Sequence, residues 1–92
     1  MADSMRRKWT DENAAFAAAQ WASGVSQKDI AAIFGCANTV MVNIAINRFL
    51  IRYTDAAVYV ERRGKYMIKE YGSARKALVK PAIENFVAAR VA

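Results

Sequence analysis

Four polar, uncharged side chains lie near the middle of the chain, three of them at regular intervals. Thr39, Asn43 and Asn47 are spaced four residues apart, and Asn38 directly precedes the first of them. On a helix, residues four apart lie on one face, so these side chains would form a row of hydrogen-bonding groups. An asparagine amide can bond adenine through N6 and N7, and a threonine methyl can contact the methyl of thymine. This row could therefore read base edges in a nucleic acid.

The row requires a helix from about residue 37 to about Arg52, preceded by a shorter helix and a tight turn. Ser26 can cap the shorter helix, with Asp29 three residues further on as the partner of a capping box. Gly35 permits the positive φ that the chain reversal needs, and the small Ala31 lets the two helices cross closely. The apolar residues expected to point inward around this turn are Ile30, Phe34, Cys36, Met41 and Ile44.

Another helix is expected before this pair, from Thr10 to about Gly24. The Thr10 hydroxyl can cap the helix, and two acidic residues follow it where the helix dipole is positive. The alanine-rich run 14–22 favours helix because alanine is the best helix former. Trp9 and Trp21 flank this run, and we expect both side chains to pack in the core.

The segment Gln27–Ile44 (QKDIAAIFGCANTVMVNI) resembles the helix-turn-helix of phage repressors and of site-specific recombinases. The preceding Trp21–Ser26 is similar to the linker before that motif in recombinase-type and GcrA-type regulators. The opening Trp9–Glu12 (WTDE) is similar to the start of GcrA-type and Myb-like domains. The resemblance covers about residues 6–50 and implies a three-helix DNA-binding core.

The resemblance also implies that the second helix of the pair enters the major groove of double-stranded DNA, with its N-terminal residues on base edges. Carried over by position, the base-reading candidates are Asn38, Thr39, Val42, Asn43 and Asn47, with Ile46 as an alternative to the last. None of the residues 38–47 is charged, whereas a groove helix commonly carries Arg or Lys. Its surplus apolar residues therefore either pack against the C-terminal half of the chain or meet a second copy.

The charge distribution predicts where a polyanion would bind. The chain has 14 Lys and Arg against 8 Asp and Glu, a net charge of +6. Residues 48–80 carry nine basic and three acidic side chains, whereas residues 9–47 have a net charge of −2. Phosphate contacts from basic side chains supply affinity without sequence preference. The candidates for these contacts are Arg6, Arg7, Lys8, Ser26, Lys28, Arg48, Arg52, Arg62, Arg63 and Lys65.

Residues 56–71 fit two structures. Their apolar residues can form one face of a helix, which we expect here. The alternative is a small β-hairpin over about 58–68, with basic residues at its turn. After it, Ser73 can cap a helix through Lys80, and Pro81 either begins a new segment or kinks a continuing one. The apolar stripe expected on the last helix consists of Ile83, Phe86, Val87 and Val91.

Residue types that are absent or rare exclude several classes of protein. The chain has no His, which removes Ser-His-Asp and Cys-His catalysis, and its lone Cys36 cannot form an internal disulfide. A zinc site would need several carboxylates, which the spacing does not supply. The longest uncharged stretch, Ile30–Asn47, contains asparagines that are costly in lipid. We therefore expect that the chain is not an enzyme and holds no metal or cofactor. We also expect no secretory signal or membrane span, and a cytoplasmic location.

Together these patterns predict one all-α domain over residues 1–92. It comprises a basic arm (1–8), a helix-turn-helix core (9–52), and a basic connector with a C-terminal helix for dimerisation (53–92). The expected function is sequence-specific binding of double-stranded DNA by a transcriptional regulator of bacterial or phage type, acting as a homo-oligomer, with a dimer favoured. Two alternatives remain open. One is an oligomeric accessory factor for DNA packaging or recombination, similar to a small terminase. The other is a protein-interaction module on the same fold.

Overall fold

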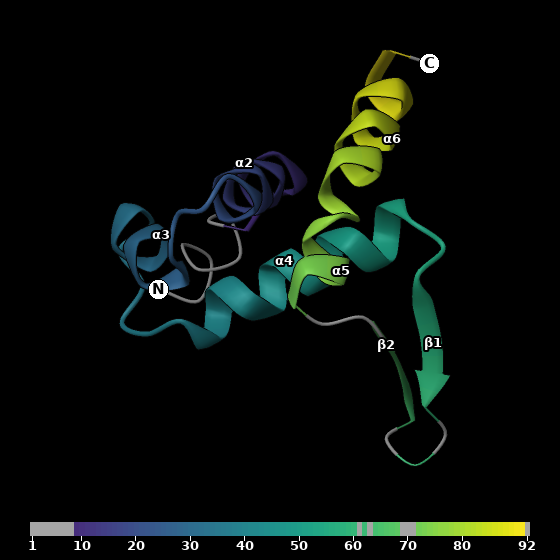
Figure 1. Cartoon of the computed structure of the whole chain (residues 1–92), viewed down its shortest axis with the longest axis horizontal. Coiled ribbons are helices and arrows are strands. Elements are labelled where there is room, and N and C mark those ends of the chain that lie inside the picture. Colours follow the sequence, from purple (N-terminus) through teal and green to yellow (C-terminus); the bar gives the residue numbers. More distant parts are fainter. Residues whose placement is uncertain (1–8, 61, 63, 69–71, 92) are drawn as a thin grey trace. The chain divides into compact units, whose positions relative to one another are not determined.

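The computed structural model describes residues 9–60, 62, 64–68 and 72–91, and of 57–60, 65 and 66 only the backbone is described. Four of the expected phosphate contacts, Arg6, Arg7, Lys8 and Arg63, lie outside the described residues. The described chain is mostly helical, as expected. The elements in order are α2 (Asp11–Ala22), α3 (Gln27–Ile33), α4 (Val40–Tyr53), β1 (Ala57–Val60), β2 (Lys65–Ile68), α5 (Gly72–Lys76) and α6 (Val79–Val91) (Figure 1).

Helix α4 crosses the boundary between two compact units, which we call the first unit (up to Ile46) and the second unit (from Asn47). From the sequence, the helix-turn-helix core is expected to end at residue 52 within a single domain, and that single domain stays a prediction. Each unit has buried apolar residues of its own. Those of the first unit are mostly alanines and β-branched residues, whereas those of the second include Phe49 and Phe86.

Helix α2 begins where the sequence predicts. The backbone N–H of Asn13 donates to the Thr10 hydroxyl at 3.1 Å, which satisfies one of the free amides of the first turn. Ala17 and Ala18 are fully buried, and Trp21 is buried beside them on the same face of the helix. Helices lined by alanine can approach closely because no long side chain separates them.

Helix α3 and the turn after it also follow the expected pattern. The backbone N–H of Asp29 donates to the Ser26 hydroxyl at 3.1 Å, and Ile30 and Ala31 are buried. Gly35 has a φ of +68°, the left-handed conformation that the chain reversal was expected to require. No other atom lies within 4 Å of where a Cβ would stand on Gly35, so the preference for glycine is one of backbone conformation alone.

Helix α4 begins two to three residues later than the sequence predicts. The backbone N–H of Val40 donates to Oδ1 of Asn38 at 2.9 Å, and that of Asn43 donates to the Thr39 carbonyl at 3.0 Å. Asn38 and Thr39 therefore cap the helix instead of forming its first turn, because a short polar side chain competes for the free backbone amides. The buried face of α4 also differs from the expected one, since Met41 and Ile44 are only partly buried. The buried residues are Val42, Ala45, Ile46, Phe49 and Leu50.

Ala57–Val60 and Lys65–Ile68 form a β-hairpin, so the expected helix is wrong and the alternative is confirmed. Strands β1 and β2 pair antiparallel, with Ala57 opposite Ile68 and Val60 opposite Lys65. Gly64 lies in the turn with a φ of +63°. The strands are rich in β-branched and aromatic residues, which suit an extended backbone, and the buried Ile68 anchors the second strand.

The last helices are built around an aromatic cluster in the second unit. The Phe86 ring lies edge-on to Phe49 at 5.7 Å and to Tyr53 at 5.4 Å, measured between ring centroids. The helix expected from Ser73 through Lys80 is wrong, because α5 ends at Lys76 and a new helix, α6, begins at Val79. Pro81 lies in the first turn of α6, where its missing N–H costs no hydrogen bond, so it does not kink a continuing helix. The expected stripe is wrong except for Phe86. The buried residues of α6 are Val79, Ala82 and Phe86.

Candidate nucleic-acid interface

Asn43, the central member of the polar row on α4, is tied to the preceding helix. Nε2 of Gln27 donates to Oδ1 of Asn43 at 3.4 Å, a partly buried hydrogen bond between the first residue of α3 and the second turn of α4. The bond holds the acceptor of the Asn43 amide towards α3. Asn43 therefore contributes to the packing of the two helices as well as lying on the face expected to read bases.

Asn47 is tied in the same way, but to a helix of its own unit, the second. Nη1 of Arg75, in α5, donates to Oδ1 of Asn47 at 3.0 Å. The Asn47 side chain is half-buried, and a charged donor on its carbonyl makes a stronger bond than a neutral one. To bond a base through this carbonyl, Asn47 would have to give up Arg75.

Val42 does not belong to the base-reading set. Its exposed fraction is 0%, so its methyl groups cannot reach a thymine methyl. The alternative Ile46 is equally buried. The error has a simple cause: α4 carries apolar residues on most of its circumference, and the packing of the other helices decides which of them turn inward. The exposed candidates that remain are Asn38 and Thr39 at the start of the helix.

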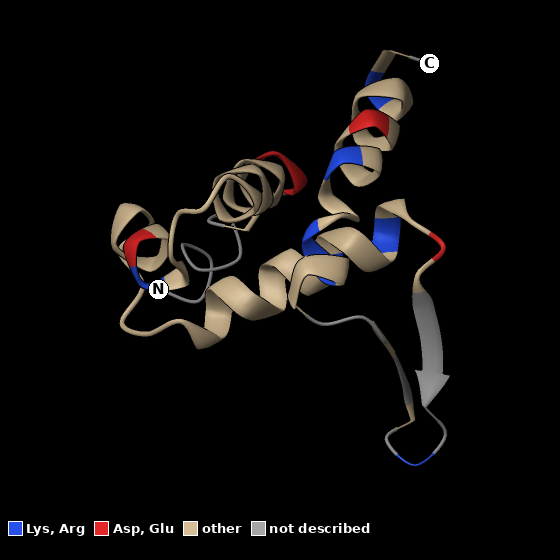
Figure 2. Ribbon diagram, in the orientation of Figure 1, with Lys and Arg blue, Asp and Glu red and all other residues tan. Residues whose placement is uncertain are grey.

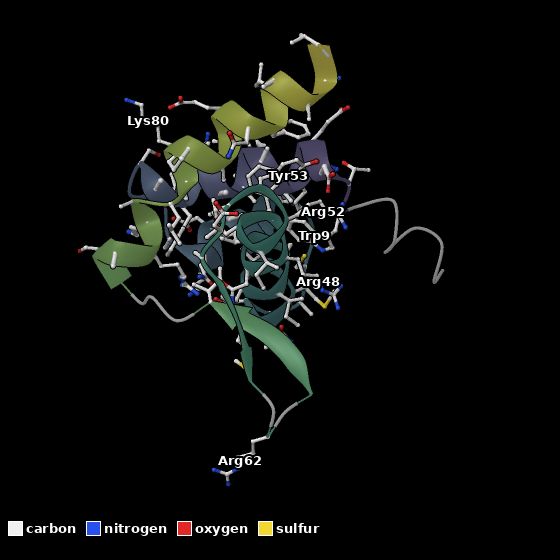
Figure 3. The ribbon with its side chains drawn as sticks, turned by 90° about the vertical axis from the view of Figure 1, so that its right-hand side faces the viewer. Trp9, Arg48, Arg52, Tyr53, Arg62 and Lys80 are labelled. Atoms are coloured by element: carbon white, nitrogen blue, oxygen red, sulfur yellow. The ribbon has the colours of Figure 1, made fainter. Side chains whose placement is uncertain are left out.

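Two arginines form a basic face on the part of α4 that belongs to the second unit. Arg48 and Arg52 are both exposed and stand four residues apart, so they lie one above the other on the helix. Figure 3 shows both side chains projecting from the same side of α4. On a helix of 3.6 residues per turn, Arg48 lies about 140° around from Asn43, so the arginines and the polar row occupy different faces.

The hairpin carries a further basic side chain to its tip. Arg62 is exposed and extends from the turn between the strands, at the far end of the hairpin from α4 (Figure 3). Lys65 opens β2, and its side chain lies outside the described residues. An arginine at the end of a two-stranded ribbon is well placed to contact a phosphate or enter a narrow groove.

Charge is divided between the two units. Most of the blue Lys and Arg segments in Figure 2 belong to the second unit, on α4, the hairpin turn, α5 and α6. From Asn47 to the end of the chain there are ten basic and four acidic residues, whereas 9–46 has one basic residue, Lys28, against three acidic ones. Of the two phosphate candidates on α3, Lys28 is exposed. The Ser26 hydroxyl oxygen already accepts from the Asp29 amide, so Ser26 has only its hydroxyl proton to donate to a phosphate.

Gln27 and Arg75, which hold Asn43 and Asn47 of the polar row, were not predicted from the sequence. Gln27 lies 16 residues from its partner and Arg75 lies 28 residues away. No local pattern marks either contact.

Within the described part of the chain, no group of His, Cys, Asp and Glu side chains is arranged to hold a metal ion. Over the same residues, no helix combines the length and apolar character needed to cross a lipid bilayer.

Comparison of this chain with models of known protein families, with functionally characterised proteins and with solved structures finds no match.

Proposed function

We propose that this chain binds double-stranded DNA sequence-specifically and regulates transcription in a bacterial or phage setting. One observation carries the proposal: the exposed pair Arg48 and Arg52 on a single face of α4, with Arg62 at the tip of the hairpin that follows. Cations spaced along a helix and a ribbon suit a row of phosphates, and such contacts supply most of the affinity of a DNA-binding protein.

The turn between α3 and α4 supports a helix-turn-helix as the element that meets DNA. The capped start of α3, the buried Ala31 and the left-handed Gly35 are the features that the motif requires. The connection over residues 34–39 is longer than the usual turn of about three or four residues. The resemblance of Gln27–Ile44 to phage repressors and recombinases adds the same motif from sequence.

In this proposal, different residues contact the bases and the phosphates of the DNA. Asn38 and Thr39, exposed at the N-terminal end of α4, together with the amide of Asn43, contact base edges. Arg48 and Arg52 contact phosphates, which carry no sequence information. The chain acts as a homo-oligomer, because two copies can occupy two half-sites.

Selection of bound sequences from random duplex DNA tests the proposal, followed by titration of the preferred duplex and a scrambled one. Thr39→Ala should weaken binding to the preferred duplex by about tenfold and leave the scrambled one nearly unchanged. Arg52→Ala should weaken both by similar factors. Ser23→Ala removes another exposed hydroxyl and serves as the control. Equal loss on both duplexes for Thr39→Ala would move Thr39 to the phosphate contacts, and absence of any DNA binding would end the proposal.

A second candidate is a protein-interaction module on the same fold. It is favoured by Val40, which opens α4 with 57% of its surface exposed, and by the lack of any charge over residues 38–47. An apolar, uncharged helix start suits a protein surface better than a groove lined with phosphates. In that case the variant Val40→Ser would abolish partner binding, while neutralising Arg48 and Arg52 together would leave it intact.

A further inference from the structure

Two exposed apolar surfaces lie outside the candidate interface. Among the described residues, the large hydrophobic side chains with most surface exposed include Phe16 and Ile33 in the first unit and Val87 and Val91 in the second. Their exposed fractions are 46%, 58%, 52% and 82%. Apolar side chains that cluster on a surface commonly mark an interaction site.

The surface in the first unit, which we call the aromatic patch, consists of Phe16, Ile33 and Phe34. The rings of Phe16 and Phe34 meet edge-to-face at 6.0 Å between centroids, which joins α2 to the end of α3. Exposed carboxylates border the patch. Glu12 stands one turn before Phe16 on α2, and Asp29 stands one turn before Ile33 on α3. The patch is therefore apolar in the middle and acidic at its edge.

The surface in the second unit lies on α6 and has the opposite charge. Val87 and Val91 stand one turn apart on the side of the helix that the aromatic cluster leaves uncovered. Lys80, seven residues before Val87, is exposed on the same face. Arg90 lies at the edge of the stripe, with its guanidinium carbon 5.4 Å from the centroid of the Phe86 ring. We call this surface the α6 stripe.

We propose that the aromatic patch of one copy of this chain binds the α6 stripe of a second copy. The middle of the contact is apolar on both sides, and its edges pair Glu12 and Asp29 with Lys80 and Arg90. The contact is heterologous, because a surface of the first unit of one copy meets a different surface, on the second unit, of the other copy.

Charge favours the contact between the aromatic patch and the α6 stripe over a symmetric contact between two α6 stripes. Two α6 stripes laid against each other would bring two copies of the exposed Lys80 together. Like charges placed across an interface oppose association, whereas complementary ones select the partner. The acidic edge of the aromatic patch supplies that complement, and the α6 stripe itself does not.

Exchange of charge across the contact tests the proposal, with the mass in solution measured by sedimentation equilibrium in the absence of DNA. The full chain should be dimeric at about 100 μM, a concentration at which a contact of micromolar affinity is filled. Asp29→Lys and Lys80→Glu should each raise the dissociation constant of the dimer by about tenfold or more. The variant carrying both changes should return to within about threefold of the parent, because each contact regains a pair of opposite charges.

Lys28→Glu, next to Asp29 on α3, is the matched control and should leave the dissociation constant nearly unchanged. Val87→Ala is a second test and should also raise the dissociation constant of the dimer, because it removes apolar contact from an exposed position without disturbing the fold. Circular dichroism checks that each variant is folded. A monomer at the stated concentration, a dimer indifferent to Asp29→Lys, or a double variant no tighter than the single ones would each overturn the proposal. Because DNA is left out, these outcomes are independent of the proposed DNA binding.

Discussion

The two units differ in what fills them and in the charge they carry. The first unit buries alanines and β-branched residues around one tryptophan, Trp21, and its described residues have more acidic than basic side chains. The second unit is built on Phe49, Tyr53 and Phe86 and carries most of the basic residues of the chain. In the proposed function, the first unit therefore supplies Asn38, Thr39 and Asn43 for the bases, and the basic second unit contacts the phosphates.

The tryptophans provide a means to observe the two units separately. Both Trp9 and Trp21 lie in the first unit, so tryptophan fluorescence reports on that unit alone. The Trp9 ring packs against Phe34 with 4.8 Å between ring centroids and a tilt of 43°, so its emission should change when α3 detaches. Hydrogen exchange of the backbone amides reports on both units. A substitution in the first unit should therefore change tryptophan fluorescence, whereas one in the second unit should change hydrogen exchange there first.

The largest effect is expected from Phe86→Ala in the second unit. Phe86 is 8% exposed and touches both other rings of the aromatic cluster. Its removal should cost about 3 kcal/mol of stability, since the lost ring leaves a cavity. Amides of α6 and of the second half of α4 should lose protection while tryptophan fluorescence changes little. A matched loss in both signals would show that the units unfold as one.

A smaller effect is expected from Gly35→Val in the first unit. The backbone of Gly35 has a φ of +68°, which a β-branched residue adopts at a cost of about 2 kcal/mol. The midpoint of urea unfolding followed by tryptophan fluorescence should fall. Gly35→Asn is the control, because asparagine tolerates this conformation better. If valine and asparagine behave alike, the conformation of the turn is not what Gly35 provides.

Ser26→Ala should cost about 1 kcal/mol, the typical worth of an N-cap hydroxyl. The hydroxyl accepts from the Asp29 amide at 3.1 Å, so that amide loses its partner in the variant. The change should appear in fluorescence and in exchange of the α3 amides. Ser23→Ala, three residues earlier, is the comparison, because its hydroxyl donates to the Gln20 carbonyl at the end of α2 and accepts from no free amide of a first turn. An unaltered midpoint would mean that water replaces the hydroxyl without cost.

The smallest effect on stability is expected from Asn43→Ala. The variant loses the 3.4 Å bond from Gln27, but alanine is the better helix former, so the balance should stay below about 1 kcal/mol. Gln27→Ala should have a similar effect, and the double variant should show whether the two residues act as one contact. A loss above about 2 kcal/mol would make Asn43 primarily a structural residue and remove it from the reading set.

The parts of the fold that local chemistry decides were predictable from the sequence. Thr10 and Ser26 are caps, and Gly35 reverses the chain, because each of these roles depends on one residue and its near neighbours. The hairpin was not decided locally. The apolar residues of its strands fit both helical and alternating spacing. The pairing of Ala57 with Ile68 joins two segments, and local sequence does not show that this pairing is preferred over a helix.

The candidate site was predictable only in part. The exposure of Arg48 and Arg52 follows from their charge and spacing. The burial of Val42 does not, because α4 has more apolar residues than one face can hold and its neighbours select among them. The contact from Arg75 to Asn47 joins positions 28 residues apart, and only the folded chain shows it.

The salt dependence of DNA binding tests the central claim, that the second unit holds a phosphate backbone. For the intact chain, the logarithm of the affinity should fall against the logarithm of the salt concentration with a slope of about −5. The double variant Arg48→Ala with Arg52→Ala should reduce that slope to about −3, because two phosphate contacts are lost. Ser23→Ala, in the first unit, should leave it unchanged. A slope near zero for the intact chain, or an unaltered slope in the double variant, would contradict the account.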